Sequence, residues 1–334
     1  MIQYLVILLD DTSTSYCHCH NGNKERNLIS LENLKSGIFF AMKENLMVQY
    51  VLPEYELPSE YKEVMNSIDS HLIVPSTCED NDAILAADVI VFESWDELYS
   101  RKYNKSQYYV IRTSKDDYFS RYLTLKTTFE QASRINVVFT DINNFTNEDY
   151  DRYKQTLSTL SLYIVKEYAK NNAIQFNLLT DRILLDKMNN CGAGDSNITL
   201  APDGKFYVCP AFYYEGKCDG KEASLADVCQ KGYSIGDLNS GLNIFNPQLY
   251  KLDYAPICRH CDAYQCKRCV WLNRKLTLEI NTPSRQQCVL AHIERNAARQ
   301  LLADIRTLGT FLPGRDIKEI NYLDPFDVRK EWQK

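Results

Sequence analysis

The sequence predicts an α/β protein with a parallel sheet, followed by a loop-rich segment that holds most of the cysteines. An apolar run at residues 2–9 is typical of a strand that is buried on both faces. Strand and helix patterns alternate over roughly the first 180 residues, which indicates parallel strands joined by crossover helices. After Cys191, turn-rich text replaces this alternation. Periodicity leaves two architectures open, an open doubly wound sheet and a partial barrel.

The predicted elements follow one another in a regular order. Strands are predicted at residues 2–9, 46–52, 71–74, 87–92, 107–112, 135–140 and 173–179. Helices are predicted at residues 30–44, 59–68, 95–102, 115–131 and 147–171. Ser30 and Thr146 are expected to cap the first and the last of these helices, because each precedes acidic residues in a first turn, where the helix dipole favours negative charge.

A further helix is predicted over residues 282–308, with Cys288 in its first turns. We therefore expect two domains, an α/β domain over residues 1–185 and a loop-rich domain over residues 186–334 that includes this helix. Chemistry in parallel α/β sheets gathers at the carboxyl ends of the strands. The polar residues expected at that edge are Asp10, Asp11, Cys17, Glu54, Glu93, Arg112, Asp141, Asn143 and Asp181.

Composition narrows the class of protein. The formal net charge of −6 argues against nucleic-acid binding, which needs a clustered positive surface. No apolar run reaches the length of a membrane span, and the apolar N-terminus lacks the basic region and cleavage site of a signal peptide. We therefore expect a cytoplasmic protein without a membrane partner. In that compartment the twelve cysteines favour metal binding over disulfides.

Seven cysteines form an ordered group. The first two stand in CGAGDSNITLAPDGKFYVCP, the next four in CRHCDAYQCKRC, and the last in the C-terminal helix. Their numbers are Cys191, Cys209, Cys258, Cys261, Cys266, Cys269 and Cys288. Thiolates gathered this closely are usually held by metal or by disulfides, and the expected compartment favours metal. A lone cysteine is more often a small buried hydrophobe, and this interpretation is preferred for Cys78, Cys218 and Cys229.

Two kinds of metal centre remain as alternatives. Zinc suits two C-x2-C pairs, and it would make the protein a zinc-stabilised, non-catalytic scaffold or a peptide-binding protein. However, only four residues separate Cys261 from Cys266, whereas zinc pairs are normally separated by a longer finger. Closely spaced thiolates favour iron–sulfur cubes, which spread four ligands around a larger inorganic core.

The order of these residues resembles the SPASM domain that follows the barrel in many radical SAM peptide-modifying enzymes. The pattern is C-x12-G-x4-C, a gap, C-x2-C-x4-C-x2-C, a second gap, and C, and IGDL at 235–238 also agrees. The family's usual central group is C-x2-C-x5-C-x3-C, so this chain is one residue shorter in each of the last two gaps. Upstream, IQFNLLTDRILLDKMNNCGAG is similar to the end of a radical SAM barrel. The resemblance implies a partial (β/α) barrel followed by a cysteine-ligated domain.

The resemblance also implies two [4Fe–4S] clusters and assigns their ligands. Cys258, Cys261, Cys266 and Cys288 would hold one cluster. Cys191, Cys209 and Cys269 would hold the other, for which a fourth ligand is not assigned. His260 and His292 are expected to act as hydrogen-bond donors near the ligands.

The usual S-adenosylmethionine site of the family is missing from the sequence. A radical SAM enzyme has C-x3-C-x2-C after its first strand, but this chain has SYCHCHN at residues 15–21. The Gly-Gly-Glu expected after the second strand is replaced by VLPEYELP. Cleavage of S-adenosylmethionine at the usual site is therefore not expected. Cys17 and Cys19 are either remnants of a lost site or an additional metal or substrate-thiol site.

This combination resembles the CXXX repeat peptide maturase branch. The resemblance implies maturation of a ribosomally synthesised precursor peptide with spaced cysteines, beside a separate radical SAM maturase. The clusters would transfer electrons or bind a substrate thiolate. No leader-binding domain is expected before the first strand, so peptide recognition is expected on the barrel, on the cysteine domain or through a partner.

Overall fold

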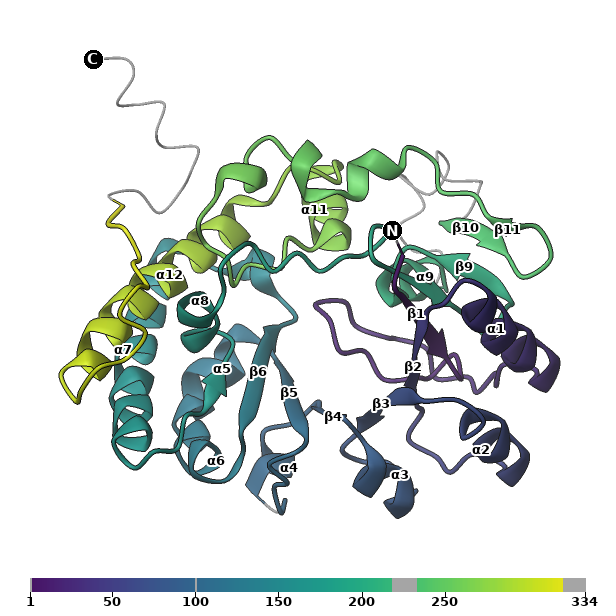
Figure 1. The fold of residues 1–334 in the computed structure, drawn as a ribbon, viewed down its shortest axis with the longest axis horizontal. Coiled ribbons are helices and arrows are strands. Elements are labelled where there is room, and N and C mark those ends of the chain that lie inside the picture. Colours follow the sequence, from purple (N-terminus) through teal and green to yellow (C-terminus); the bar gives the residue numbers. More distant parts are fainter. Residues whose placement is uncertain (1, 100, 218–232, 321–334) are drawn as a thin grey trace. The chain divides into compact units, whose positions relative to one another are not determined.

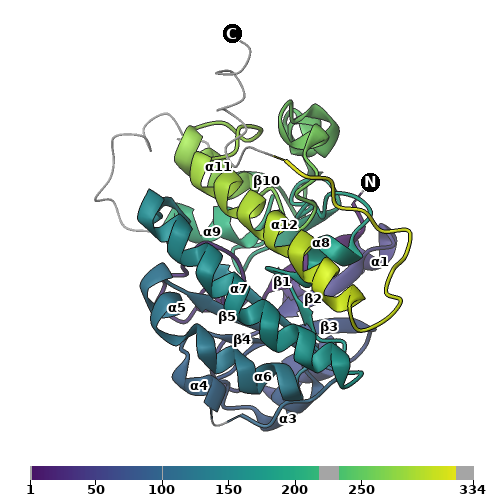
Figure 2. The same cartoon turned by 90° about the vertical axis from the view of Figure 1, so that its left-hand side faces the viewer.

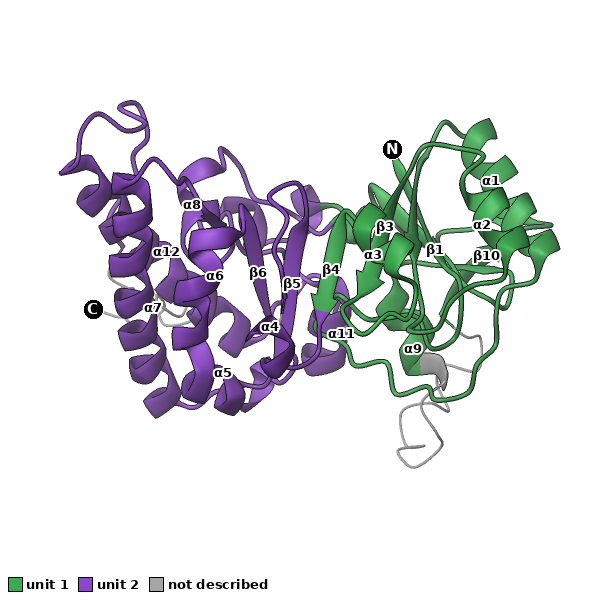
Figure 3. Ribbon diagram, turned by 90° about the horizontal axis from the view of Figure 1, so that it is seen from below, with its two compact units in different colours: residues 1–91, 192–251 green, residues 92–191, 252–334 purple. Residues whose placement is uncertain are grey.

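The computed structural model describes residues 2–99, 101–217 and 233–320, and it confirms a mixed α/β fold with a largely parallel sheet (Figure 1). The chain forms two compact units (Figure 3). Unit 1 comprises residues 1–91 and 192–251, and unit 2 comprises residues 92–191 and 252–334. The domain division at residues 185 and 186 stays a prediction. None of the described helices combines the length and the apolar character of a membrane span.

Unit 1 is built on a sheet with the strand order β11-β10-β9-β8-β1-β2-β3-β4. The parallel strands are β1 (Tyr4–Leu8), β2 (Met47–Val51), β3 (Ser70–Pro75), β4 (Val89–Phe92, which ends at the unit boundary) and β8 (Asn197–Leu200). The antiparallel extension consists of β9 (Lys205–Tyr207), β10 (Ser234–Asp237) and β11 (Gly241–Leu242). The late strand β8 therefore pairs with the first strand, a contact that the alternation pattern did not predict.

The helices of unit 1 are α1 (Leu31–Lys43), α2 (Ser59–Met65), α3 (Asn81–Ala86) and α9 (Pro210–Lys217), with a 3₁₀ turn at Pro247–Tyr250. The expected cap of α1 is confirmed, because Ser30 Oγ accepts the N–H of Asn33 at 3.1 Å. Gly37 lets α1 approach the sheet, since a Cβ there would lie 2.4 Å from Leu200 Cδ2 and 3.6 Å from Ile7 Cδ1.

Unit 2 contains the parallel strands β5 (Tyr108–Thr113), β6 (Arg134–Phe139) and β7 (Gln175–Phe176). Its helices are α4 (Asp96–Tyr99), α5 (Lys115–Arg121), α6 (Leu125–Gln131), α7 (Asn147–Ala169), α8 (Thr180–Leu184), α11 (Val270–Thr277) and α12 (Arg285–Arg306). Short 3₁₀ turns lie at Tyr122–Thr124, Ile142–Asn144, Leu252–Tyr254 and Cys258–His260. The long helix α12 packs along α7 (Figure 2).

Two predicted elements of unit 2 differ from the structure. The helix expected at residues 115–131 is divided into α5 and α6 by the 3₁₀ turn that separates them. The strand expected at residues 173–179 is reduced to two residues. Beyond them, the side chain of Asn177 makes hydrogen bonds to β6. Its Oδ1 accepts from Val137 N at 2.8 Å, and its Nδ2 donates to Val137 O at 2.9 Å. Thr180 Oγ1 then accepts from Phe176 N at 2.7 Å, and the chain turns into α8.

Candidate cysteine site

Three of the predicted ligands lie together in unit 2. Cys258 and Cys261 are joined by a tight turn, in which Cys261 N donates to Cys258 O at 3.1 Å. The next turn brings Cys266 back, because its N–H donates to Ala263 O at 3.0 Å. Burial raises the pKa of Cys258 to about 11 and that of Cys266 further, and Cys258 and Cys261 add to the shift of Cys266. Two tight turns therefore bring the three cysteines together at a place where burial favours the neutral thiols.

Hydrogen-bond donors face the sulfur atoms of this group. Ala263 N donates to Cys261 Sγ at 3.4 Å, and Gln287 Nε2 donates to Cys266 Sγ at 3.8 Å. The buried His292 places Nε2 3.4 Å from Cys261 Sγ. Gln287 and His292 both belong to α12, which also carries Cys288 next to Gln287. The helix therefore brings the segment of a fourth predicted ligand to the other three.

The remaining predicted ligands fall in both units. Cys191 N donates to Lys267 O at 2.8 Å, so this cysteine lies beside the central cysteine segment of unit 2. Cys269 occupies the residue before α11. Cys209 belongs to unit 1, between β9 and α9. His260 is exposed, and its Nε2 accepts a hydrogen bond from Arg259 Nε at 3.0 Å.

Three buried arginines lie close enough to Cys258 or Cys261 for their charges to act on these thiols. Arg295 donates to Asp262 from Nε and Nη2 at 2.8–3.1 Å. Arg182 lies 3.5 Å from the same carboxylate and stacks over Tyr264, with its Cζ 4.3 Å from the ring centroid. Burial disfavours the Asp262 carboxylate, but the charges and hydrogen bonds of Arg295 and Arg182 outweigh it and lower the pKa. Arg268 is also buried.

The residues present fit a sulfur-ligated, negatively charged group. The donor set combines closely spaced thiols with N–H groups directed at sulfur and with nearby guanidinium side chains, and these donors and charges oppose the effect of burial on the thiolates. Some buried polar atoms here have no hydrogen-bond partner among the described residues, and they are Arg182 Nε, Gln265 Oε1, Asn273 Oδ1 and Gln287 Oε1. Such atoms commonly mark a missing water, ion or cofactor. Within the described ranges, no three His, Cys, Asp or Glu side chains are arranged to hold a single metal ion.

The loop with Cys17 and Cys19 is fixed by hydrogen bonds within unit 1. Asp10 accepts from Thr12 N at 2.8 Å and from Tyr55 OH at 2.9 Å. Asn21 Nδ2 bridges two backbone carbonyls of the loop at 2.8 Å each. Cys19 is 2% exposed, with Sγ 3.2 Å from Ser15 Oγ, and Cys17 is half-buried. A metal role for this pair stays a prediction.

Two tyrosines on α9 hold the same loop, and sequence reasoning missed both. Tyr213 OH donates a short hydrogen bond to Asp11, and Tyr214 OH donates to Ser13 O at 3.1 Å. Burial and the bond to Asp11 raise the pKa of Tyr213, so the phenol stays a donor. The sequence did contain one signal for such donors, the acidic pair Asp10 and Asp11 directly after an apolar strand. Buried carboxylates need hydrogen-bond donors, so donors elsewhere in the chain could have been expected.

The polar residues at the strand ends form separate pairs. Arg112 on β5 makes a short ion pair with Glu93, and Asp141 accepts from Lys115 N at 2.9 Å. Asp181 does not lie at the carboxyl ends of the strands, where it was expected. It pairs with Arg134, the first residue of β6, at 2.9 Å, and therefore lies toward the amino end of that strand. The early end of β7 and the turn into α8 account for this position.

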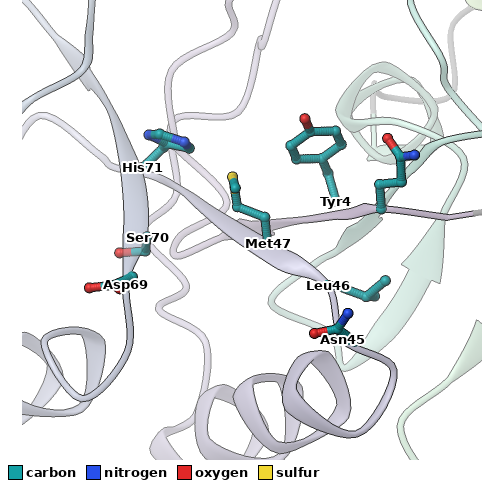
Figure 4. A pocket seen from close by; sticks show the side chains of 8 residues that line it. Tyr4, Asn45, Leu46, Met47, Asp69, Ser70 and His71 are labelled. Atoms are coloured by element: carbon teal, nitrogen blue, oxygen red, sulfur yellow. The ribbon is translucent and has the colours of Figure 1, made fainter.

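A pocket of about 610 Å³ opens at the amino ends of β1, β2 and β3 (Figure 4). Its lining consists of Gln3, Tyr4, Asn45, Leu46, Met47, Asp69, Ser70 and His71. Figure 4 shows Tyr4, Met47 and His71 on the same side of their strands. None of the predicted site residues lines this pocket.

No protein-family model matches the chain, and no curated protein matches its sequence. Solved structures do match its fold. The anaerobic sulfatase-maturating enzyme anSMEcpe, a radical SAM/SPASM enzyme, with bound AdoMet and Kp18Cys peptide aligns with a TM-score of 0.56 and 10% identity, over 91% of this chain and 99% of that chain. Its complex with AdoMet and Cp18Cys peptide gives 0.56 and 11%, over the same 91% and 99%. The tagged enzyme with AdoMet gives 0.59 and 10%, over 92% and 96%.

These likenesses establish the fold. The chain has the parallel sheet of a radical SAM partial barrel, followed by a C-terminal cysteine-rich region. The predicted fold class is thereby confirmed. At about 10% identity the likeness supports the architecture alone.

Proposed function

We propose that this protein takes part in the maturation of a ribosomally synthesised precursor peptide with spaced cysteines, and that its seven ordered cysteines hold two [4Fe–4S] clusters. The observation that carries the proposal is the group of Cys258, Cys261 and Cys266, which two tight turns bring together next to N–H donors and guanidinium side chains. The matching peptide complexes of anSMEcpe support a peptide as the substrate class.

We divide the ligands between the two clusters as the resemblance to the SPASM domain implies. Cys258, Cys261 and Cys266, with Cys288 from α12, would hold the first. Cys191, Cys209 and Cys269 would hold the second, whose fourth position is left to another donor or to a substrate thiolate. Bound clusters of this type supply one-electron transfer.

The chain's own residues prepare the first of these sites. The N–H groups of Ala263 and Gln287 are directed at sulfur and would stabilise thiolates there. Arg295 and Arg182 neutralise Asp262, which would otherwise repel a negative group next to Cys261. Cys258 is buried and Cys261 and Cys266 are half-buried, so the protein limits the access of water to their sulfur atoms.

A separate radical SAM maturase is the proposed partner. The support is the missing C-x3-C-x2-C after the first strand, where Asp10, Asn21 and Tyr213 hold the loop by hydrogen bonds instead. Without those three thiolates this loop has no usual ligand set for activating S-adenosylmethionine. We place the protein in the cytoplasm, where thiols stay reduced.

Anaerobic purification followed by iron, sulfide and zinc analysis tests the proposal. We expect about eight iron and eight sulfide atoms per chain, since two cubic clusters contain four of each. Binding of a cysteine-repeat peptide, compared with its serine-substituted form, tests the substrate class by fluorescence anisotropy. Stoichiometric zinc with almost no iron would instead identify a zinc-stabilised scaffold.

A further inference from the structure

Arg268 occupies an unusual position between two of the proposed ligands. It lies in the sequence CKRC, after Cys266 and directly before Cys269. The residue is 1% exposed, and its backbone φ is +41°, in the left-handed region that non-glycine residues rarely adopt. A buried charged side chain on a strained backbone has a free-energy cost, so an arginine at this position calls for a role.

The side chain of Arg268 links segments that carry ligands of both proposed clusters. Its Nε donates to Asn190 Oδ1 at 3.0 Å, and Asn190 directly precedes Cys191. Its Nη1 donates to Asn281 Oδ1 at 2.9 Å, in the loop that leads to α12 and Cys288. The guanidinium is therefore held in a fixed place by two side-chain amides.

The same residue acts on the first cluster group in two further ways. Its backbone N–H hydrogen-bonds to Cys266, and its positive charge acts on Cys258. Charge and N–H···S hydrogen bonds are two of the factors that set the potential of an iron–sulfur cluster. Reduction adds one negative charge to the cluster, so a fixed positive charge favours the reduced form.

We propose that Arg268 sets the reduction potential of the iron–sulfur site by holding a buried positive charge between the ligand segments of both clusters. The inference rests on the proposed function, because it requires the cysteines to hold iron–sulfur clusters. The step concerned is the gain of one electron by a cluster from a low-potential one-electron donor, and no bond forms or breaks. Arg268 is thus a residue that tunes the clusters without ligating them.

Redox titration with dithionite, followed by EPR and visible absorption, measures the effect. We expect Arg268→Gln to lower the reduced fraction at a fixed potential, changing the oxidised-to-reduced ratio at least tenfold, which is about 59 mV for a one-electron couple. Arg268→Lys keeps the charge and should shift the ratio less. Lys267→Gln is the matched control, because it removes the same charge from the neighbouring, solvent-exposed residue.

Asn281→Asp provides a second variant that leaves Arg268 in place. The new carboxylate would neutralise the guanidinium, so it should lower the potential in the same direction even if Arg268→Gln does not fold. If Arg268→Gln binds its full complement of iron and has the same reduction potential as Lys267→Gln, the inference is overturned. If Arg268→Gln lacks iron, the same comparison is made between Asn281→Asp and Lys267→Gln. Absence of iron from the unmodified protein would instead overturn the proposed function itself.

Discussion

Tyr153 OH donates a hydrogen bond to Glu294 Oε1 at 2.8 Å, which joins α7 to α12 in the interior of unit 2. Gln265 Nε2, next to a proposed ligand, donates to the other carboxylate oxygen at 3.2 Å. Burial raises the pKa of Glu294 to about 7, although both hydrogen bonds oppose the shift. The carboxyl group therefore titrates near neutral pH.

Unfolding of the metal-free protein should depend on this group. The folded pKa lies above the ordinary value of 4.5, so the folded state binds more protons, and stability decreases as the pH rises from about 4.5 to about 7. For the unmodified protein we expect the free energy of unfolding to fall by about 2–3 kcal/mol over that pH range, and in Glu294→Gln this fall should be absent. Urea unfolding at pH 5 and pH 7.5 measures it. Equal pH dependence in both proteins would contradict the shifted pKa.

Substitution of a proposed ligand should reduce the iron content, whereas substitution of a buried cysteine elsewhere should not. We expect Cys266→Ala to release the iron of one cluster, roughly half of the total, because its thiol is central to the first ligand group. Cys78→Ala is the control, since Cys78 is a buried cysteine of unit 1 that is expected only to pack there. Iron and sulfide analysis after anaerobic reconstitution distinguishes the two. Equal iron loss from both variants would argue against the assignment.

Removal of the Tyr213 hydroxyl should destabilise unit 1. In Tyr213→Phe the buried Asp11 carboxylate loses a donor, which typically costs about 1–3 kcal/mol. Tyr207→Phe is a matched control, because Tyr207 OH donates to Asp203, an exposed residue that water can solvate. Urea unfolding should show the larger loss for Tyr213→Phe, and the reverse order would exclude a structural role for the Asp11 bond.

The Asn177 side chain should contribute more to the free energy of unfolding than the exposed side chain of Asn143. Asn177→Ala removes both hydrogen bonds to Val137 and leaves two backbone groups of β6 without them, so we expect a loss of about 1–3 kcal/mol. Asn143→Ala changes an exposed side chain and should stay within about 0.5 kcal/mol. Denaturant unfolding compares them, and similar values would show that the side-chain ladder adds little stability.

The sequence predicted the α/β class because its signals were local. Ser30 and Thr146 cap their helices as expected, and the apolar run at residues 2–9 contains β1. The strand at 173–179 was overestimated, since an apolar pattern does not reveal that the Asn177 side chain, rather than further backbone, pairs with Val137. Short helices such as α11 have too few turns for a clear period.

The ligand set of the cysteine site stays a prediction, and its surroundings were only partly predictable. Spacing identified Cys258, Cys261, Cys266 and Cys269 as one group, and the first three lie close to one another in the structure. The contribution of Arg268 and of Tyr213 was not predictable, because both act over long sequence separations or through backbone geometry that a linear pattern does not encode.

Pairing of β8 with β1 has a consequence for how the chain folds during synthesis. β1 pairs with β2 on one side and with residues 197–200 on the other. A nascent or truncated chain that ends near residue 185 would leave that edge exposed, and open edges of apolar strands promote aggregation. The N-terminal half should therefore depend on the ribosome, or on a chaperone, until the cysteine-bearing part has emerged.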